Sequence, residues 1–567
     1  MKYDNFKIKG LKCVDNLEQD LIVDEQNLDD QMLSGSAWMT LGSMLSRILG
    51  ALYIIPWMAM MGNIDVAASA NALYQIGYIP YTFFLTFATA GVPSAISKSV
   101  SKYNAMGEYE TSKVIYKQGL KIMLITGALS AGIMFIFAPL LASTGPSSNI
   151  DDAVLVIRSL APALLIIPVQ SITRGLIQGH NRMKEPALSQ VVEQVIRIAF
   201  ILGAVYVIRI VLKADVVYAV AFSTFAAFIG AVASLVYLGV RLKSIPTAFN
   251  MAPEQSHQQV NVSANELIIE IIKTSIPFIV VSTGIIIFQL IDQQTYAPLM
   301  KYFNNTPAKE IEITYGIVQG NAQKLSTILT SFGAALAITA VPLISNLMIK
   351  HDLRQVGRQF GKAIQLLLFI MLPASIGMAI LAEPIYVIFF GYSELGVRVT
   401  VLYAVVSIFM ALYILLGNVL QSANQQRPAI YAVFIGFGFK LVTQPFFILT
   451  MGPFGMLAST LVGLTSTCFL MIWIMRLAVH FDVKRLLKRV GLLIGITAIM
   501  ALIVYLGKLG LDSFLNYESR IQSLAAVLIL AVIGGLVYMV LTLKTRIADD
   551  LLGSTAVKIR NKLHLKP

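Results

Sequence analysis

The chain has 567 residues, of which 57% are hydrophobic and only 13% are charged. Soluble globular proteins are about 45–50% apolar and about 25% charged, so a soluble domain could not bury this much apolar surface. The composition also excludes disordered, collagen-like and disulfide-scaffold chains. The remaining class is an all-α polytopic membrane protein, because the apolar stretches are continuous and do not alternate as in a β-barrel.

The first segment, residues 1–35, is rich in acidic residues. A signal peptide would place positive charge directly before an apolar core, so this segment is predicted to be an acidic cytoplasmic tail. Apolar runs then predict about 14 transmembrane helices, since each span needs roughly 20 apolar residues. Their ranges are 36–61, 71–97, 119–143, 153–177, 187–208, 216–240, 266–291, 317–343, 363–389, 399–421, 428–450, 455–475, 490–508 and 521–543. The longest predicted outer loop is 292–316.

Lys and Arg residues, 43 in total, are distributed unevenly between the predicted loops. If the N-terminus is inside, the outer loops hold only Arg209, Lys213, Lys301, Lys309, Arg398, Lys508 and Arg520. The positive-inside rule therefore predicts a multi-pass protein of the cell membrane with both termini cytoplasmic. The net charge of +13 then indicates contact with anionic membrane lipids, and no nucleic acid partner is predicted.

Two motifs recur at a spacing near 245 residues. A Val-Pro pair ends both the second span (Pro93) and the eighth (Pro342), and a Gln–Asn segment precedes Pro186 and Pro428. A repeat of six helices returns the chain to the same side, so the two halves are parallel. The predicted organisation is an N-terminal six-helix lobe (36–243), a cytoplasmic linker (244–265), a C-terminal six-helix lobe (266–487), two extra transmembrane helices (488–545) and a basic cytoplasmic tail (546–567).

Seven cationic residues fall inside predicted spans: Arg47, Arg158, Arg174, Arg197, Lys273, Lys324 and Lys440. A charge at the bilayer centre costs roughly 2.5–3.5 kcal/mol on insertion scales, so such residues face a partner or an aqueous cavity. Three of them lie near span ends and are predicted to snorkel to the interface: Arg158, Arg174 and Lys273.

The other four cations are candidates for a binding site. Arg197 follows Glu193 by four residues, which leaves an intrahelical ion pair and a ligand role both open. No acidic residue lies within a turn of Lys440, and Arg47 is deep in the first span. Lys324 lies in a polar patch that a lipid-facing helix would not carry. The predicted substrate-binding residues are Arg47, Lys324, Lys440, Arg197, Gln323 and Asn321.

These residues predict a positively charged cavity between the two lobes, which favours an anionic substrate. The sequence contains no paired carboxylates, Ser-His-Asp set or metal-ligand cluster at membrane depth. It therefore predicts a transporter rather than an enzyme, with no catalytic residue, no metal and no cofactor.

The first span contains Ser46-Arg47-Ile48-Leu49-Gly50 and resembles the Ser-Arg-x-x-Gly signature of the MurJ-type lipid II flippases. These flippases belong to the multidrug/oligosaccharidyl-lipid/polysaccharide exporter superfamily. Two further segments, 91–98 and 315–325, are similar to its YtgP/SpoVB-type Gram-positive members. The resemblance covers roughly residues 36–545.

The resemblance implies a flippase that moves the undecaprenyl-pyrophosphate-linked peptidoglycan precursor from the inner to the outer leaflet by alternating access. It implies that Arg47 and Lys324 meet the pyrophosphate, with Lys324 in place of an arginine. Tyr53 and Asn71 stand where Gram-negative members carry an arginine and an aspartate. The implied partners are the lipid-linked anionic glycan, membrane lipids and proteins of cell-wall synthesis or division.

Three alternatives remain open at this point. The cargo could be another lipid-linked polysaccharide unit, which the sequence barely separates from lipid II. A multidrug or cation antiporter of the same superfamily is disfavoured by the two extra spans and the cationic interior. A membrane glycosyl- or acyltransferase would require catalytic groups that the sequence does not present.

Overall fold

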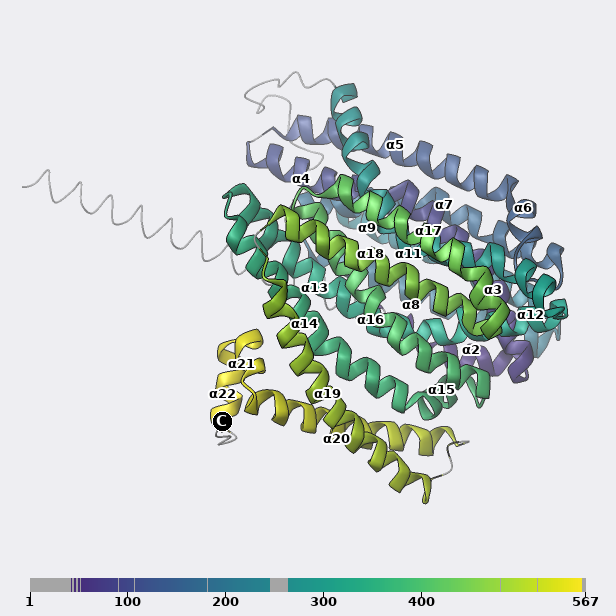
Figure 1. Cartoon of the computed structure of the whole chain (residues 1–567). Coiled ribbons are helices and arrows are strands. Elements are labelled where there is room, and N and C mark those ends of the chain that lie inside the picture. The colour runs from purple at the N-terminus through teal and green to yellow at the C-terminus, as the bar shows by residue number, and fades with distance from the viewer. Residues whose placement is uncertain are drawn as a thin grey trace, which may run out of the picture.

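The computed structural model describes residues 42, 45–46, 49–50, 52–89, 91–106, 108–180, 182–244, 264–479, 481–515, 517 and 519–562. Within these residues every regular element is a helix, which confirms the predicted all-α fold (Figure 1). The predicted acidic tail, 1–35, and most of the predicted linker, 244–265, lie outside the described residues.

The first half of the described chain contains eight α-helices and one π-helical turn. They are α2 (Ile54–Met61), α3 (Ile64–Thr89), α4 (Val92–Ala105), α5 (Tyr109–Ile136), α6 (Ala138–Ser143), α7 (Ile150–Gly179), α8 (Lys184–Val205), the π-helix η1 (Tyr206–Val211) and α9 (Val216–Lys243).

The second half begins with a long helix and contains a second π-helix. Its elements are α11 (Ala264–Asn304), α12 (Ala308–Tyr315), the π-helix η3 (Gly316–Ala322), α13 (Gln323–Ile349), α14 (Leu353–Ile380), α15 (Ala382–Phe390), α16 (Glu394–Ser422), α17 (Gln426–Met451), the 3₁₀ turn η4 (Gly452–Phe454) and α18 (Gly455–Ala478). Four helices follow: α19 (Val483–Asp512), α20 (Arg520–Lys544), α21 (Ile547–Leu552) and α22 (Ser554–Lys562).

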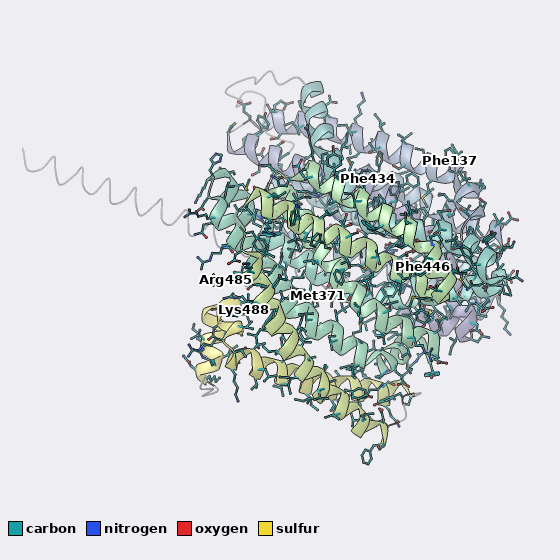
Figure 2. The ribbon with its side chains drawn as sticks, in the orientation of Figure 1. Phe137, Met371, Phe434, Phe446, Arg485 and Lys488 are labelled. Carbon is teal, nitrogen blue, oxygen red and sulfur yellow. The ribbon has the colours of Figure 1, made fainter. Side chains whose placement is uncertain are left out.

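Eleven helical segments of the described chain are long and apolar enough to cross a membrane. One of them, Gln426–Ala478, joins α17 and α18 through η4. Helix α3 is not among the eleven, and it carries the buried polar residues Ser69, Asn71 and Gln75. Large apolar side chains such as Phe434 and Phe446 project away from the bundle on α17, as expected for a lipid-facing surface (Figure 2). The chain is therefore a multi-pass helical membrane protein. The predicted count of about 14 spans is consistent with the eleven segments found in the described residues.

Helices of the same half of the chain pack mainly on one another. In the first half α7 contacts α3, α4, α5 and α9, and α8 packs along α9. In the second half α16 contacts α13, α14 and α18, while α17 packs along α18 and α11. Helices α19 and α20 lie at one side of the bundle, against α14 and α15 (Figure 1). This packing is compatible with the predicted lobe boundaries, which stay predictions.

Helix α3 is where the first half meets the second, because it contacts α11, α12 and η3. Two glycines of η3 allow the approach. A Cβ atom at Gly316 would overlap the backbone carbonyl of Ala68, and one at Gly320 would lie 2.9 Å from the side chain of Asn71. The two backbones can come this close only because these positions carry no side chain. We call the contact between α3 and the α11–α12–η3–α13 segment the seam.

The structure corrects the predicted outer loop 292–316. Helix α11 continues to Asn304 and α12 begins at Ala308, so only residues 305–307 connect them. Asp292 and Gln293 have the polarity of loop residues, but both are buried. The prediction assigned their polarity to solvent, whereas Gln293 donates to the carbonyl of Ile76 on α3 and Asp292 accepts from Lys440 on α17.

The predicted basic tail, 546–567, contains two short helices within its described part. Arg489 of α19 is paired with Asp550 of α21, and Arg560 of α22 is paired with Asp549. Arg485 and Lys488 lie at this same end of the bundle, and Phe137 lies at the opposite end (Figure 2). The tail is therefore fixed to the end of α19 that carries a cluster of positive charge.

The substitution Gly316→Ala is expected to separate α3 from η3, because the added methyl group meets backbone atoms that cannot rotate away. Labelling of Ala67→Cys by a membrane-impermeant maleimide in intact cells measures the effect. Ala67 lies buried on α3, one residue from the contact. We expect labelling to rise severalfold when Gly316→Ala is added.

Gly377→Ala is the matched control, since a Cβ atom at Gly377 of α14 would have no neighbour within 4 Å. Alanine favours a helix over glycine by ~1 kcal/mol, so the control should be neutral or slightly stabilising. Equal labelling in the two variants would contradict a close seam.

Candidate functional site

Two cations from different halves of the chain lie against the same tyrosine of α3. Arg197 of α8 donates a hydrogen bond from Nη2 to the Tyr74 hydroxyl at 3.1 Å, and its guanidinium lies 5.6 Å from the ring centre of Tyr78. The ammonium of Lys324 on α13 lies 5.1 Å from the ring centre of Tyr74 and 5.5 Å from that of Trp57. We call these five residues, Trp57, Tyr74, Tyr78, Arg197 and Lys324, the Tyr74 cluster.

No ion pair neutralises either cation of the Tyr74 cluster within the described part of the chain. The Nζ of Lys324 donates to Oδ1 of Asn71 at 2.6 Å, and both cations are only partly buried. Cation–π contacts of this kind contribute about 0.5–2 kcal/mol each and leave the full positive charge in place. Two uncompensated charges in an apolar bundle are suited to an anion that carries more than one negative charge.

Two further predicted site residues, Asn321 and Gln323, line the seam. Asn71 donates from Nδ2 to Oδ1 of Asn321 at 2.5 Å, and Asn321 donates in turn to the hydroxyl of Tyr386 at 2.9 Å. Gln75 donates from Nε2 to the carbonyl of Gln319 at 2.7 Å and to Oε1 of Gln323 at 3.2 Å. Asn321 and Gln323 are both buried, so in this conformation their hydrogen bonds close the seam.

A buried carboxylate adds to the seam at the end of the bundle predicted to be outer. Glu312 of α12 is 2% exposed and accepts hydrogen bonds from Ser69 of α3, from Lys309, and from the backbone N–H of Ser148 at 2.6 Å. The sequence analysis missed this residue because it placed 292–316 in a loop. The only local signal was Lys309 three residues earlier, which predicts a helical pair but says nothing of α3.

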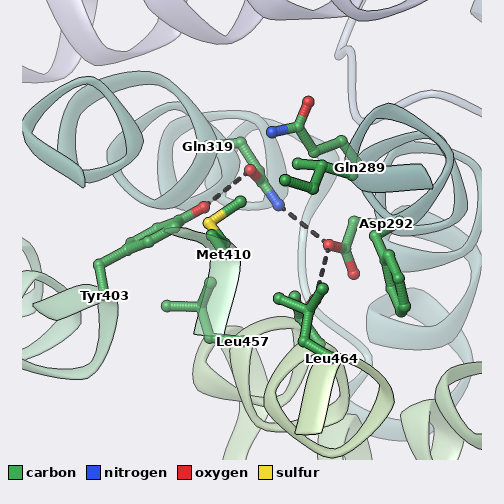
Figure 3. Close-up of a pocket in the computed structure, with 10 residues that line it drawn as sticks. Gln289, Asp292, Gln319, Tyr403, Met410, Leu457 and Leu464 are labelled. Atoms are coloured by element: carbon green, nitrogen blue, oxygen red, sulfur yellow. Dashed lines mark hydrogen bonds between the residues drawn. The ribbon is translucent and has the colours of Figure 1, made fainter. Parts of the chain in front are cut away.

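Lys440 meets an acid that the sequence analysis did not connect with it. The residue is fully buried on α17, and its Nζ lies 2.7 Å from Oδ1 of Asp292 on α11. The other carboxylate oxygen, Oδ2, accepts from Nε2 of Gln319 at 3.1 Å (Figure 3). The charge of Lys440 is thus paired with a buried carboxylate, unlike the two cations of the Tyr74 cluster. The structure gives no support for direct contact between Lys440 and a substrate.

Of the two alternatives left open for Arg197, the structure does not show the ion pair with Glu193, since Glu193 pairs with Arg174 of α7 at 2.7 Å. Arg174, expected to snorkel, is a half-buried ion-pair partner that also donates to Ser189 at 2.8 Å. Arg197 is thereby left for Tyr74 and Tyr78.

Two predicted cations cannot be placed. Arg47 and the side chain of Lys273 lie outside the described residues. On either side of Arg47 in sequence, Gly42 and Gly50 lie against Ala187 and Gln194 of α8. Helix α8 is also the helix that carries Arg197.

Comparison with known proteins identifies similar sequences along most of the chain. The family model for polysaccharide biosynthesis proteins matches residues 32–348, and the MatE model matches residues 319–446. The chain is 34% identical over 524 residues to the lipid II flippase MurJ of Bacillus subtilis (strain 168), which covers 90% of this chain and 95% of that relative. It is 28% identical over 211 residues to the stage V sporulation protein B of the same organism, covering 37% of this chain and 39% of the relative.

Solved structures show the same fold at low sequence identity. A lipid II flippase MurJ in an inward closed conformation superposes with a TM-score of 0.62 at 15% identity, covering 91% of this chain and 99% of that structure. An inward-facing multidrug resistance transporter of the MATE family gives a TM-score of 0.57 at 14% identity, covering 78% of this chain and 96% of the other. The second similarity stops short of the full chain length.

Replacing Glu193 by glutamine is expected to destabilise the protein, because the guanidinium of Arg174 would lose its carboxylate while remaining half-buried. Removing one partner of such a bond costs about 1–3 kcal/mol. The apparent midpoint of thermal unfolding in detergent should fall by several degrees.

The exposed pair of Arg398 and Glu394 provides the control, since both side chains are about two-thirds exposed. Exposed pairs contribute about 0–1 kcal/mol, so Arg398→Ala should barely move the midpoint. A similar shift in both variants would argue against a structural role for the Arg174–Glu193 pair.

Proposed function

This chain belongs to the polysaccharide biosynthesis protein family and to the family of the lipid II flippase MurJ, and from that premise we propose that it flips lipid II. Its cargo is the undecaprenyl-pyrophosphate-linked peptidoglycan precursor, moved from the inner to the outer leaflet of the cell membrane. The observation that carries the proposal is that Arg197, at the hydroxyl of Tyr74, and Lys324, over its ring, have no ion-pair partner among the described residues. A pyrophosphate supplies the negative charge that this pair lacks.

The two cations suit different parts of one headgroup. Arg197 presents a planar fork of donors that can bind two phosphate oxygens at once, whereas Lys324 is a compact point charge. Arg47 is proposed as the third cationic contact, on the strength of the first-span signature. Asn321 and Gln323 would add neutral hydrogen bonds once the seam opens.

The seam gives the proposed transport cycle a physical step. Lys324 of the second half donates to Asn71 of the first half, so an anion that takes up the Lys324 ammonium removes one hydrogen bond from the seam. The same opening would release Asn321 and Gln323 from α3. Cargo binding and parting of the halves are thereby linked, as alternating access by rigid lobes requires.

The proposal includes the orientation and setting of the protein. Both termini are placed in the cytoplasm by the distribution of Lys and Arg between loops. Transport would leave the lipid covalently unchanged, so the proposal invokes no cofactor chemistry. Proteins of cell-wall synthesis or division, which consume the flipped precursor, are the proposed partners.

A flippase for another lipid-linked polysaccharide unit is the second candidate, since the matching family model describes polysaccharide biosynthesis proteins in general. A cation antiporter has weaker support. It would use a buried carboxylate as an exchange site, and here the buried carboxylates of Asp292 and Glu312 are already paired with Lys440 and Lys309.

The variants Lys324→Ala and Arg47→Ala are each expected to fail to restore growth of a strain depleted of its own lipid II flippase. The physical reason is the loss of a phosphate-binding charge with membrane insertion intact. Lys324→Arg should retain most activity, because it keeps the charge. Lys301→Ala, an exposed lysine at the end of α11, is the matched control and should support full growth.

A leaflet-accessibility assay for lipid II after rapid depletion of the protein separates the two candidate cargoes. Lipid II should become inaccessible from outside within the depletion period, followed by lysis and loss of cell shape. Normal lipid II exposure with loss of another surface polymer would transfer the assignment to the second candidate. Full growth of the Arg47→Ala and Lys324→Ala strains would overturn both.

A further inference from the structure

The ammonium of Lys440 occupies a cage of oxygen atoms in the interior of the second half. It donates to Oδ1 of Asp292 at 2.7 Å and to Oγ1 of Thr460 at 2.6 Å. Two more oxygens, Oγ of Ser459 and the carbonyl of Met456, each lie at 3.4 Å. The lysine side chain is 0% exposed, so its charge depends on these atoms from α11 and α18 and not on water.

The oxygen atoms that accept from the Lys440 ammonium are also of the kinds that bind a metal cation. Carboxylate, carbonyl and hydroxyl oxygens are the ligands of hard cations, and membrane transporters hold alkali cations with such atoms between their helices. The cage offers four oxygens to an ammonium that has only three N–H groups. The four oxygen atoms therefore surround the ammonium as ligands surround a metal ion, and they outnumber the hydrogen bonds that its three N–H groups can direct.

We propose that Lys440 is a tethered cation that permanently fills a cation-binding cage formed by Asp292, Met456, Ser459 and Thr460. The protein then needs no free alkali cation at this position during its cycle. Removal of the lysine side chain converts the cage into a binding site for a small alkali cation such as Na⁺.

The cage is connected to the seam, so its occupancy has consequences for transport. Gln319 donates from its side chain to Asp292, accepts from the hydroxyl of Tyr403 at 2.9 Å, and accepts on its backbone carbonyl from Gln75 of α3 (Figure 3). Gln319 belongs to the π-helix η3, and π-helical turns are often found at functional sites. A fixed charge in the cage keeps Asp292, and through it Gln319, in one position while α3 moves.

The neighbourhood has room for a free cation once the lysine is shortened. A small cavity of about 10 Å³ lies beside the cage and is lined by Asp292, Gln319, Tyr403 and Thr460 among others. In Lys440→Ala the space of the removed side chain adds to this cavity. The carboxylate of Asp292 would then be a buried charge without a partner, which is strongly unfavourable until a cation enters.

The test compares thermal unfolding of the purified full-length protein in detergent, in sodium, lithium, potassium or choline chloride at constant ionic strength. The wild-type protein should unfold at the same temperature in all four salts. Lys440→Ala should unfold several degrees lower in choline chloride and should regain stability in a saturable manner with Na⁺ or Li⁺, because a ligand that binds only the folded state stabilises it.

Two variants control for general salt effects. Lys440→Ala combined with Asp292→Asn lacks the charged ligand and should not respond to Na⁺. Lys508→Ala breaks a different lysine ion pair, the partly buried one with Glu383, and should likewise show no Na⁺ response. If Lys440→Ala cannot be purified, Lys440→Met fills the stem volume without the charge, and a lowered unfolding temperature that Na⁺ restores would support the proposal.

Two results would overturn the proposal. One is a saturable, Na⁺-specific stabilisation of the wild-type protein that disappears in Asp292→Asn, since it would mean that a free cation already binds. The other is a folded Lys440→Ala protein that no alkali cation stabilises. Either outcome leaves the cargo assignment untouched, because the readout does not involve lipid transport.

Discussion

The cost of placing positive charge inside an apolar bundle is the constraint from which the rest of this structure follows. Such a charge is tolerated only beside a partner or in contact with water. The described helices meet this requirement in two ways. Arg174 and Lys440 are paired with the carboxylates of Glu193 and Asp292. Arg197 and Lys324 lie instead on the rings of tyrosines and a tryptophan.

The two solutions have different consequences for function. A carboxylate partner cancels the charge, and the pair becomes part of the scaffold. An aromatic face attracts the cation by its quadrupole but leaves the charge available to another anion. The division of the cations into paired and unpaired sets is therefore what distinguishes scaffold from candidate cargo site, although all of them are basic residues at membrane depth.

Helix α3 links the candidate site to the seam. Tyr74 contacts both cations of the site, and Asn71 and Gln75, on either side of it, bond η3 and α13. A change at the site is thus a change at the seam, because one rigid helix carries both. The glycines of η3 permit this closeness, and a larger residue at Gly316 would meet backbone.

The sequence by itself determined the membrane class, the all-helical fold and the positions of most helices, because those properties depend on local hydropathy and charge. It also identified Lys324 and Arg197 as cations that need an explanation, and its resemblance to flippases agrees with the family found by comparison. Helix ends were less certain: the polar stretch Asp292–Gln294 has the composition of a loop, yet it lies within α11.

Only the tertiary structure decided which cations have acidic partners. Lys440 and Asp292 are separated by 148 residues, and Arg174 and Glu193 lie on different helices. A sequence reports neighbours one turn apart on the same helix, which is why Glu193 was considered as a partner for Arg197 and not for Arg174. Ion pairing depends on distances of a few ångströms across helix interfaces, and those distances are fixed by side-chain packing that no local pattern encodes.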